Sequence, residues 1–371
     1  MTPWRLIGQM IASWRDRRIA FSEMRRMTRA ENDTLALSDA NPLHRAQVSL
    51  DVGDKASARH YLALARERIP AYVESNPDTI EVLLGLEDFA ECDAFALAGA
   101  KRYRRRPEFI EGYALSAERR PDLEEAVRRW AIARKKFPYR VRGYVAGVGC
   151  LRQLGRFDEA EALLRQALRQ TPDDIRLLLE RGRVLEARGD WNEAYQHWIS
   201  LQDRHFAGII GAAQALHKLG RTAEAEALLV AARPTNPIEP LIPILYARLA
   251  EESGNKAEAV KRWAFVRDRF PLERAGYIDG MRLLREQREW AEADAIGEAA
   301  VHRFPADEWP LVEYAFLAQA SQDWPESAKR WAAVRAAFPD RKDAPQREAD
   351  ALARAKAAAD QRGPDSAAAS N

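Results

Sequence analysis

Large apolar residues return along this chain at a fixed spacing, and small and acidic residues return with them. Trp130, Trp198, Trp263 and Trp331 are separated by 68, 65 and 68 residues. Each tryptophan follows a glutamate by five residues, as it does after Glu125, and a small residue by four. A fixed period of this length is typical of repeat architectures. The pattern therefore predicts an array of similar units rather than one central core.

A second apolar series divides this period in half. The segment 159–164 (Glu-Ala-Glu-Ala-Leu-Leu) recurs at 224–229 and, more loosely, at 292–296, with offsets of 65 and 68 residues. The long period is therefore two units of 34 residues. Units that start at 39, 73, 107, 141, 175, 206, 240, 274 and 308 place every feature in register, and only the unit 175–205 is short, by three residues.

Three positions of the unit predict two helices joined by a turn. Position 15 is glycine in five units, which suits the left-handed backbone that ends one helix before the next begins. Position 32 is proline in seven units and stops the second helix, because proline lacks a backbone donor. Position 20 is small, as at Ala126 and Ala259, which permits a close helix crossing. The glycines are Gly53, Gly155, Gly189, Gly220 and Gly254.

These residues resemble the tetratricopeptide repeat family. Its 34-residue helix-turn-helix unit has small residues at positions 8, 20 and 27, an aromatic residue at 24 and proline at 32, and this chain matches at Ala213 for position 8 and Ala133 for position 27. Gly297 departs from the pattern at position 24, and the units at 39 and 73 are degenerate. The resemblance covers 39–341 and implies an all-α fold, a right-handed α-solenoid of about nine repeats.

The segments outside the array are expected to cap it. Residues 1–38 carry apolar residues at helical spacing among many arginines, which predicts amphipathic capping helices. Residues 342–362 predict a C-terminal capping helix, and 363–371 a disordered tail. Residues 1–30 could also lie on an anionic membrane surface. We favour the cap.

Composition narrows the class of protein. The net charge is only +2, which does not indicate nucleic-acid binding, and the two cysteines cannot form a disulfide framework. The basic run 101–106 is best explained by the negative end of a helix dipole rather than by a nucleic-acid patch. The chain has no run of 18 apolar residues, so no membrane-spanning helix is predicted. We expect a cytoplasmic protein, and the abundance of alanine and arginine suggests a bacterial one.

No arrangement of residues predicts catalysis. The six histidines form no HExxH pair and none lies beside a cysteine at metal-ligand spacing, and there is no glycine-rich phosphate loop. The glutamate before each tryptophan recurs four times, which indicates a structural helix N-terminus rather than one special catalytic environment. The tryptophans could stack on sugars or bases, but we favour core packing. We therefore predict no enzyme activity, no metal and no cofactor.

The family resemblance implies a binding groove. In such repeats, first-helix positions 2, 5, 9, 12 and 13 line a concave surface. Several of these positions carry arginine, and a ladder of guanidiniums would favour an anionic ligand such as an acidic peptide. The alternative is that long arginine side chains only keep the wall solvated. The implied partner-binding residues are Glu74, Glu81, Glu108, Glu111, Arg142, Arg176, Arg183, Gln214, Lys218, Arg248 and Arg282.

The sequence thus predicts a non-catalytic scaffold that binds a peptide or protein segment in this groove. An alternative is an accessory module of bacterial envelope polysaccharide or glycosyltransferase assembly, held at the membrane surface through residues 1–30.

Overall fold

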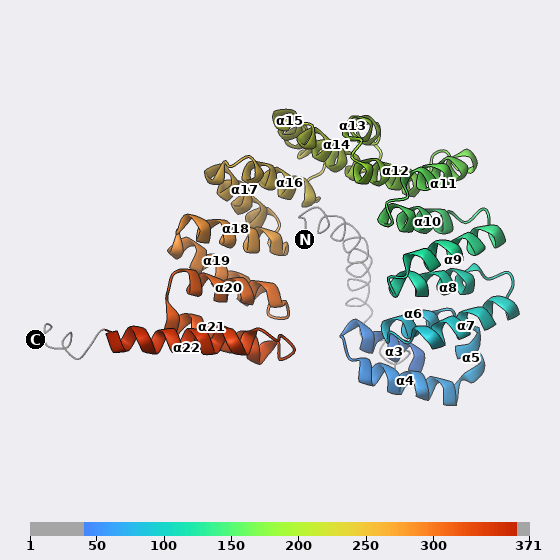
Figure 1. The fold of residues 1–371 in the computed structure, drawn as a ribbon, viewed down its shortest axis with the longest axis horizontal. Coiled ribbons are helices and arrows are strands. Elements are labelled where there is room, and N and C mark those ends of the chain that lie inside the picture. The colour runs from blue at the N-terminus through green and yellow to red at the C-terminus, as the bar shows by residue number, and fades with distance from the viewer. Residues whose placement is uncertain (1–40, 362–371) are drawn as a thin grey trace, which may run out of the picture. The chain divides into compact units, whose positions relative to one another are not determined.

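The computed structural model describes residues 41–361, and this range holds twenty helices and no strand. Figure 1 shows the helices following one another in pairs joined by short turns. The chain divides into two compact units, Met1–Arg188 and Gly189–Asn371. The predicted all-α repeat fold is confirmed. The predicted capping segment 1–38 and the tail 363–371 lie outside the described residues.

The described part of the first unit contains ten helices. They are α3 (Pro42–Asp51), α4 (Lys55–Arg68), α5 (Pro70–Ser75), α6 (Asp78–Gly85), α7 (Phe89–Arg102), α8 (Pro107–Arg119), α9 (Leu123–Lys136), α10 (Val141–Gln153), α11 (Phe157–Gln170) and α12 (Ile175–Arg188).

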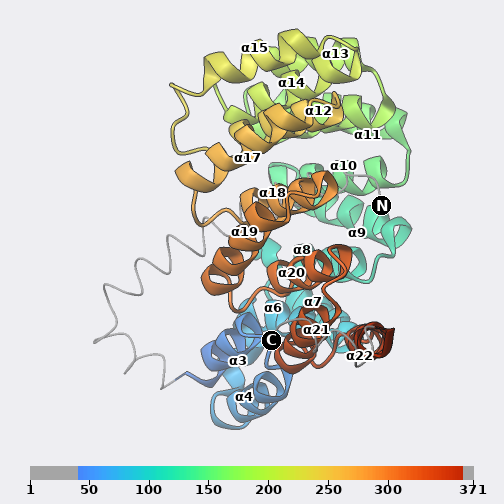
Figure 2. The same ribbon diagram turned by 90° about the vertical axis from the view of Figure 1, so that its left-hand side faces the viewer.

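The described part of the second unit also contains ten helices. They are α13 (Trp191–Ile199), α14 (Phe206–Lys218), α15 (Thr222–Ala232), α16 (Leu241–Glu252), α17 (Lys256–Arg269), α18 (Arg274–Gln287), α19 (Trp290–Arg303), α20 (Glu308–Ala320), α21 (Trp324–Ala337) and α22 (Ala344–Gln361). Figure 2 shows α17 to α22 stacked in chain order. The last helix, α22, occupies most of the segment 342–362 in which a capping helix is predicted, and it packs against α21.

A left-handed residue makes the turn inside most helix pairs, and in several pairs a capping side chain follows it. Between α16 and α17, Gly254 has φ +77° and Asn255 caps the second helix by accepting the Glu258 N–H at 3.2 Å. The glycines that the sequence marks as turns all have positive φ. Arg288 and Gln322 occupy the corresponding position in later pairs, with φ 63° and 62°. The turn geometry is therefore kept where glycine is absent.

Most second helices bury a small residue and a large one. Ala126 and Ala259 are completely buried, and so are the neighbouring Trp130, Trp263 and Trp331. Core packing of the tryptophans is thus confirmed, and stacking of these side chains on an external sugar or base is wrong.

The first helices of several successive pairs lie against each other. Contacts join α6 to α8 and α10 to α12 in the first unit, and α14 to α16 and α18 to α20 in the second. We call the exposed surface of α6, α8, α10 and α12, and of α14, α16, α18 and α20, the first-helix face of the respective unit. Because these helices are neighbours in space, residues 34 apart in the sequence fall into rows across that face.

Candidate binding face

A buried arginine in the first unit ties three helices together behind the first-helix face. Arg129 of α9 donates from Nε to Glu125 at 2.7 Å and from Nη1 and Nη2 to the two oxygens of Asp93 on α7, at 2.7 and 2.9 Å. Nη1 also donates to the Tyr113 carbonyl oxygen on α8 at 2.9 Å. Its guanidinium carbon lies 3.7 Å from the centre of the Tyr113 ring. We call this arrangement an arginine clamp.

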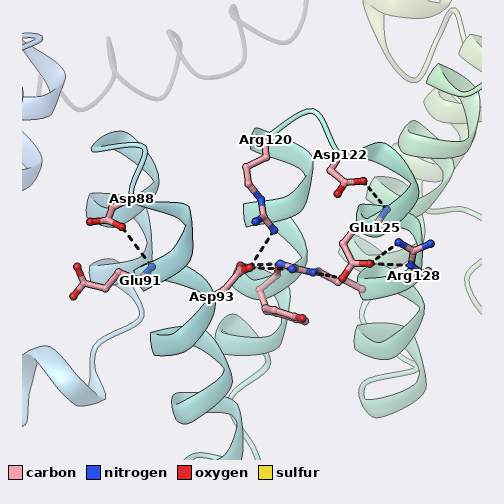
Figure 3. Close-up of polar contacts among 9 residues, drawn as sticks. Asp88, Glu91, Asp93, Arg120, Asp122, Glu125 and Arg128 are labelled. Atoms are coloured by element: carbon pink, nitrogen blue, oxygen red, sulfur yellow. Dashed lines mark hydrogen bonds and ion pairs between the residues drawn. The ribbon is translucent and has the colours of Figure 1, made fainter.

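Figure 3 shows how the carboxylates of this clamp are shared. Asp93 on α7 also accepts a hydrogen bond of 3.1 Å from Arg120, the residue that follows α8. Glu125 also accepts a bond from Arg128 on the outer side of α9. Burial alone would raise the pKa of Asp93, but the bonds from Arg129 bring that pKa below its usual value. Both carboxylates are therefore charged, and they compensate the buried guanidinium.

The second unit repeats this clamp twice. Arg262 of α17 binds Glu258, Glu226 of α15 and the Tyr246 carbonyl at 3.0, 2.7 and 2.8 Å, and it lies 3.5 Å from the Tyr246 ring centre.

Arg330 of α21 binds Glu326, Asp294 of α19 and the Tyr314 carbonyl at 2.9, 2.6 and 3.1 Å, and it lies 3.4 Å from the Tyr314 ring centre. The same ring explains Gly297, because a Cβ there would lie 2.1 Å from Tyr314 Cδ2. The corresponding sequence positions before Trp198 hold His197 and Arg181 instead of arginine and tyrosine.

Two of the buried tryptophans, Trp130 and Trp263, orient carboxylates on the first helices. Trp130 Nε1 donates to Glu118 of α8 at 3.1 Å, and Trp263 Nε1 donates to Glu251 of α16 at 3.4 Å. Burial raises the pKa of Glu118, and the indole bond only partly offsets this effect. Each tryptophan thus fixes the direction of an acidic side chain at a predicted groove position.

The predicted arginine ladder of the first unit is paired with carboxylates. Arg183 binds Glu180 of the same helix, α12, and Arg152 of α10 lies 3.5 Å from the second oxygen of Glu180. Arg142 lies 3.6 Å from Glu111, a distance longer than a hydrogen bond, and its side chain is half exposed. Arg176 binds Asp174 in the preceding turn. The charges of this face therefore largely cancel.

The second unit pairs its ladder more tightly. Arg282 donates to Glu251 at 2.6 Å, lies 3.3 Å from Asp279, and lies 3.1 Å from Glu286. Arg248 lies 3.7 Å from Asp279. Burial raises the pKa of Asp279, against the opposing effect of both arginines. Trp263 donates to the other oxygen of Glu251, so this carboxylate links the buried tryptophan to the charged side chains of the first-helix face.

The remaining predicted residues differ in their access to a partner. Glu81 and Glu108, on α6 and α8, have no ion pair in the described part of the chain. Glu111 is buried and binds Arg140 through two bonds of 3.1 Å. Gln214 is 7% exposed, and its Nε2 has no partner among the described residues. Lys218 ends α14.

The placement of Glu74 on a first helix is wrong. Glu74 belongs to the short helix α5, and it binds Arg102 at 3.0 Å. Pro70 starts this extra helix, and the first helix of the pair, α6, begins only at Asp78, after Pro77. Proline at both places breaks the chain into two short helices where the repeat pattern predicts one.

No metal-ligating or reactive cluster is seen in residues 41–361. Groups of three or more histidine, cysteine or acidic side chains with metal-binding geometry are absent from this range. Burial raises the pKa of Cys92 to about 11 and that of Cys150 to about 12, so both thiols are protonated at neutral pH. None of the helices between Pro42 and Gln361 is long and apolar enough to cross a membrane.

Comparisons with known proteins agree with this geometry. Residues 151–198 match the family model of the tetratricopeptide repeat. Yeast Tom70 has a similar structure, with a TM-score of 0.55 and 14% identity over 93% of this chain and 87% of that chain. A tetratricopeptide repeat protein from Parabacteroides merdae ATCC 43184 has a TM-score of 0.45 and 17% identity over 63% of this chain and 94% of that chain. No curated protein matches the sequence.

Proposed function

Because this chain is a tetratricopeptide repeat protein, we propose that it is a non-catalytic scaffold that binds a peptide or protein segment along its first-helix faces. The observation that supports this most strongly is the set of charged side chains on neighbouring first helices of each unit, among which Glu118 and Glu251 are held by buried tryptophans. Fixed polar groups recognise a partner without a large loss of side-chain entropy on binding.

The ion pairs indicate which arginines are available to an acidic ligand. Arg282 and Arg183 already bind carboxylates of their own unit, so an acidic ligand would have to displace those bonds. Arg142 and Arg248 lie 3.6 and 3.7 Å from their carboxylates and keep donors for an incoming anion. We therefore assign acidic groups of a ligand to Arg142 on the face of the first unit and, independently, to Arg248 on the face of the second unit.

Replacement of these two arginines tests the proposal. Capture of the partner from a lysate of the source cells by an Arg142→Gln/Arg248→Gln variant should fall roughly tenfold, since two charge-assisted hydrogen bonds are lost. The matched control is Lys135→Gln/Lys261→Gln, which removes the same charge from exposed positions on α9 and α17. Partners are quantified by mass spectrometry, and each variant is checked for helicity. Equal capture by both variants would remove the support for the first-helix face.

The membrane-linked alternative stays a prediction. Its support lies in residues 1–30, outside the described part of the chain. A cytoplasmic location likewise remains part of the proposal.

A further inference from the structure

Exposed cations gather where two second helices of the first unit end. The last turn of α7 and the turn after it hold five of them in six residues, and the end of α9 with its following turn holds three more. These eight residues are Lys101, Arg102, Arg104, Arg105, Arg106, Lys135, Lys136 and Arg140. A helix dipole explains a cation in the last turn, but its effect fades beyond that turn. Arg104 and Arg105 follow the end of α7, so the dipole does not account for them.

The same part of the repeat is far less basic in the second unit. The corresponding segments 234–239, 268–273, 302–307 and 336–341 contain at most one lysine or arginine each. Arg104 also occupies the repeat position at which seven units have proline. Because helix pairs of the second unit form without these cations, the fold alone does not require them.

The two basic segments lie side by side. Lys136 Nζ at the end of α9 donates to the Ala100 carbonyl oxygen near the end of α7, at 2.9 Å. The clamp between Arg129 and Asp93 joins the same two helices further along. The cations of both segments therefore belong to one continuous part of the surface.

This surface keeps an excess of positive charge. Two carboxylates near it, Glu74 and Glu111, already bind Arg102 and Arg140. Lys101, Arg104, Arg105 and Lys135 have no ion pair with another residue in the described part of the chain. These four side chains can meet an anionic partner without breaking an internal bond.

Large apolar side chains are exposed among the cations. Tyr139, in the turn after α9, is 88% exposed, Ile132 is 50% exposed, and Leu97 is 45% exposed. Leu97 precedes Lys101 by four residues on α7, and Ile132 precedes Lys135 by three on α9, so each shares a helix face with a cation. We call these three side chains and the eight cations the basic edge.

An anionic lipid bilayer matches both components of the basic edge. Anionic headgroups attract lysine and arginine, and the boundary between headgroups and acyl chains accepts aliphatic and tyrosine side chains. A nucleic acid would also attract the cations. It binds apolar surface by stacking its bases on aromatic rings, however, and Leu97 and Ile132 offer no ring. The combination therefore favours a bilayer.

We propose that the basic edge attaches the first unit to the surface of an anionic lipid bilayer. Arg104, Arg105 and Lys135 bind headgroup phosphates, and Ile132 and Tyr139 enter the boundary below the headgroups. This surface is formed by the ends of second helices, apart from the first-helix face that carries the proposed peptide binding. The attachment therefore goes beyond the proposed function and does not depend on it.

Flotation of the full chain with lipid vesicles tests the attachment. Vesicles of mixed phosphatidylcholine and phosphatidylserine should carry the protein upward, and vesicles of phosphatidylcholine alone should not. Raising the salt from about 0.1 M to about 0.5 M should weaken binding, because salt screens exposed charges. Arg104→Gln/Arg105→Gln should lower the partition onto the mixed vesicles roughly tenfold, since two cations near the lipid surface are lost. Ile132→Ser/Tyr139→Ser should lower it by a similar factor.

Matched variants remove the same groups from other parts of the surface. Lys261→Gln/Lys356→Gln removes two exposed cations from α17 and α22, and Ile238→Ser/Leu272→Ser removes two exposed apolar side chains from turns of the second unit. Both should bind the mixed vesicles like the wild type. Circular dichroism checks that every variant keeps its helix content.

A fluorescent label on α9 reports the contact itself. Ala131 is exposed beside Ile132, and Cys92 and Cys150 are buried, so Ala131→Cys can be labelled selectively with nitrobenzoxadiazole. Its emission should move to shorter wavelength when the mixed vesicles are added, because the label leaves water.

The attachment is disproved if the protein does not float with the mixed vesicles, if either basic-edge variant floats like the wild type, or if the matched variants lose binding equally. Binding of single-stranded RNA through Arg104 and Arg105, without vesicle binding, would assign the basic edge to nucleic acid instead. Peptide capture separates this failure from failure of the proposed function. Lys135→Gln/Lys261→Gln should capture the partner normally and float less, and Arg142→Gln/Arg248→Gln should do the reverse.

Discussion

At the scale of single residues, the buried arginine that precedes each of three tryptophans is the most specific packing feature of the repeats. A guanidinium is stable inside a protein only if its donors and its charge are compensated. Arg262 meets this need with two carboxylates, a carbonyl and a tyrosine ring. Lysine could not replace it, because an ammonium has neither the planar fork nor the stacking surface.

Removal of one clamp arginine should destabilise the protein measurably. Arg262→Met leaves Glu226, Glu258 and the Tyr246 carbonyl without their donor, and we expect a loss of about 2–3 kcal/mol in the free energy of unfolding. Arg221→Met removes an exposed arginine that also binds a glutamate, and it should cost less than about 1 kcal/mol. Urea unfolding followed by circular dichroism measures both. Equal losses would show that the clamp is no stronger than a surface ion pair.

Glu118 gives a prediction of pH dependence. Burial raises the pKa of this carboxyl above its value in the unfolded chain, so the folded state holds the proton more tightly. Stability from this group is therefore greatest at low pH and falls as pH rises through the raised pKa. Glu118→Gln keeps an acceptor for Trp130 but carries no charge. The corresponding position of a later repeat holds Gln319.

Thermal unfolding at two pH values tests this sign. The Glu118→Gln variant should melt higher than the wild type at pH 7, and the difference should disappear near pH 4. A difference that grows toward low pH would contradict the burial of the charged carboxylate.

At the scale of helices and turns, the left-handed residue between paired helices is the recurring local device. Glycine occupies it at Gly155 and Gly254, as the sequence predicts. Arg288 and Gln322 adopt the same geometry. A side chain in this region is unfavourable by about 1–2 kcal/mol, because its Cβ crowds the following carbonyl oxygen. Packing of the paired helices imposes the turn on these two residues.

Two substitutions in this turn should change the stability of the protein in opposite directions. Gln322→Gly should stabilise by about 0.5–1 kcal/mol, since glycine adopts positive φ without strain. Gly155→Ala should destabilise by about 1 kcal/mol or more, although space around it is open. Midpoints of thermal unfolding compare the two. A loss of stability in Gln322→Gly would mean that the Gln322 side chain has a role beyond the turn.

At the scale of the whole molecule, a repeat array is stabilised mainly by contacts between neighbouring repeats. Each clamp joins the second helix of one pair to the second helix of the next, across the first helix between them. The clamps therefore act on the local stability of the pairs that they connect.

Hydrogen exchange should map this locality. Arg129→Met should speed amide exchange in α7 to α9 and leave α15 to α17 unchanged, while Arg262→Met should do the reverse. Mass spectrometry of peptides from each variant gives the readout. Uniform acceleration along the chain in either variant would argue against nearest-neighbour stabilisation.

The sequence by itself determined the helix pairs, the turn positions and the buried tryptophans, because these repeat with a period that depends only on local geometry and on the nearest pair. It also placed Arg248 and Arg282 on successive first helices of the second unit, α16 and α18. The tertiary structure decided which charges remain available to a partner. Arg282 meets Glu251, 31 residues earlier, and Arg129 meets Asp93, 36 residues earlier, through helix packing that no local pattern encodes.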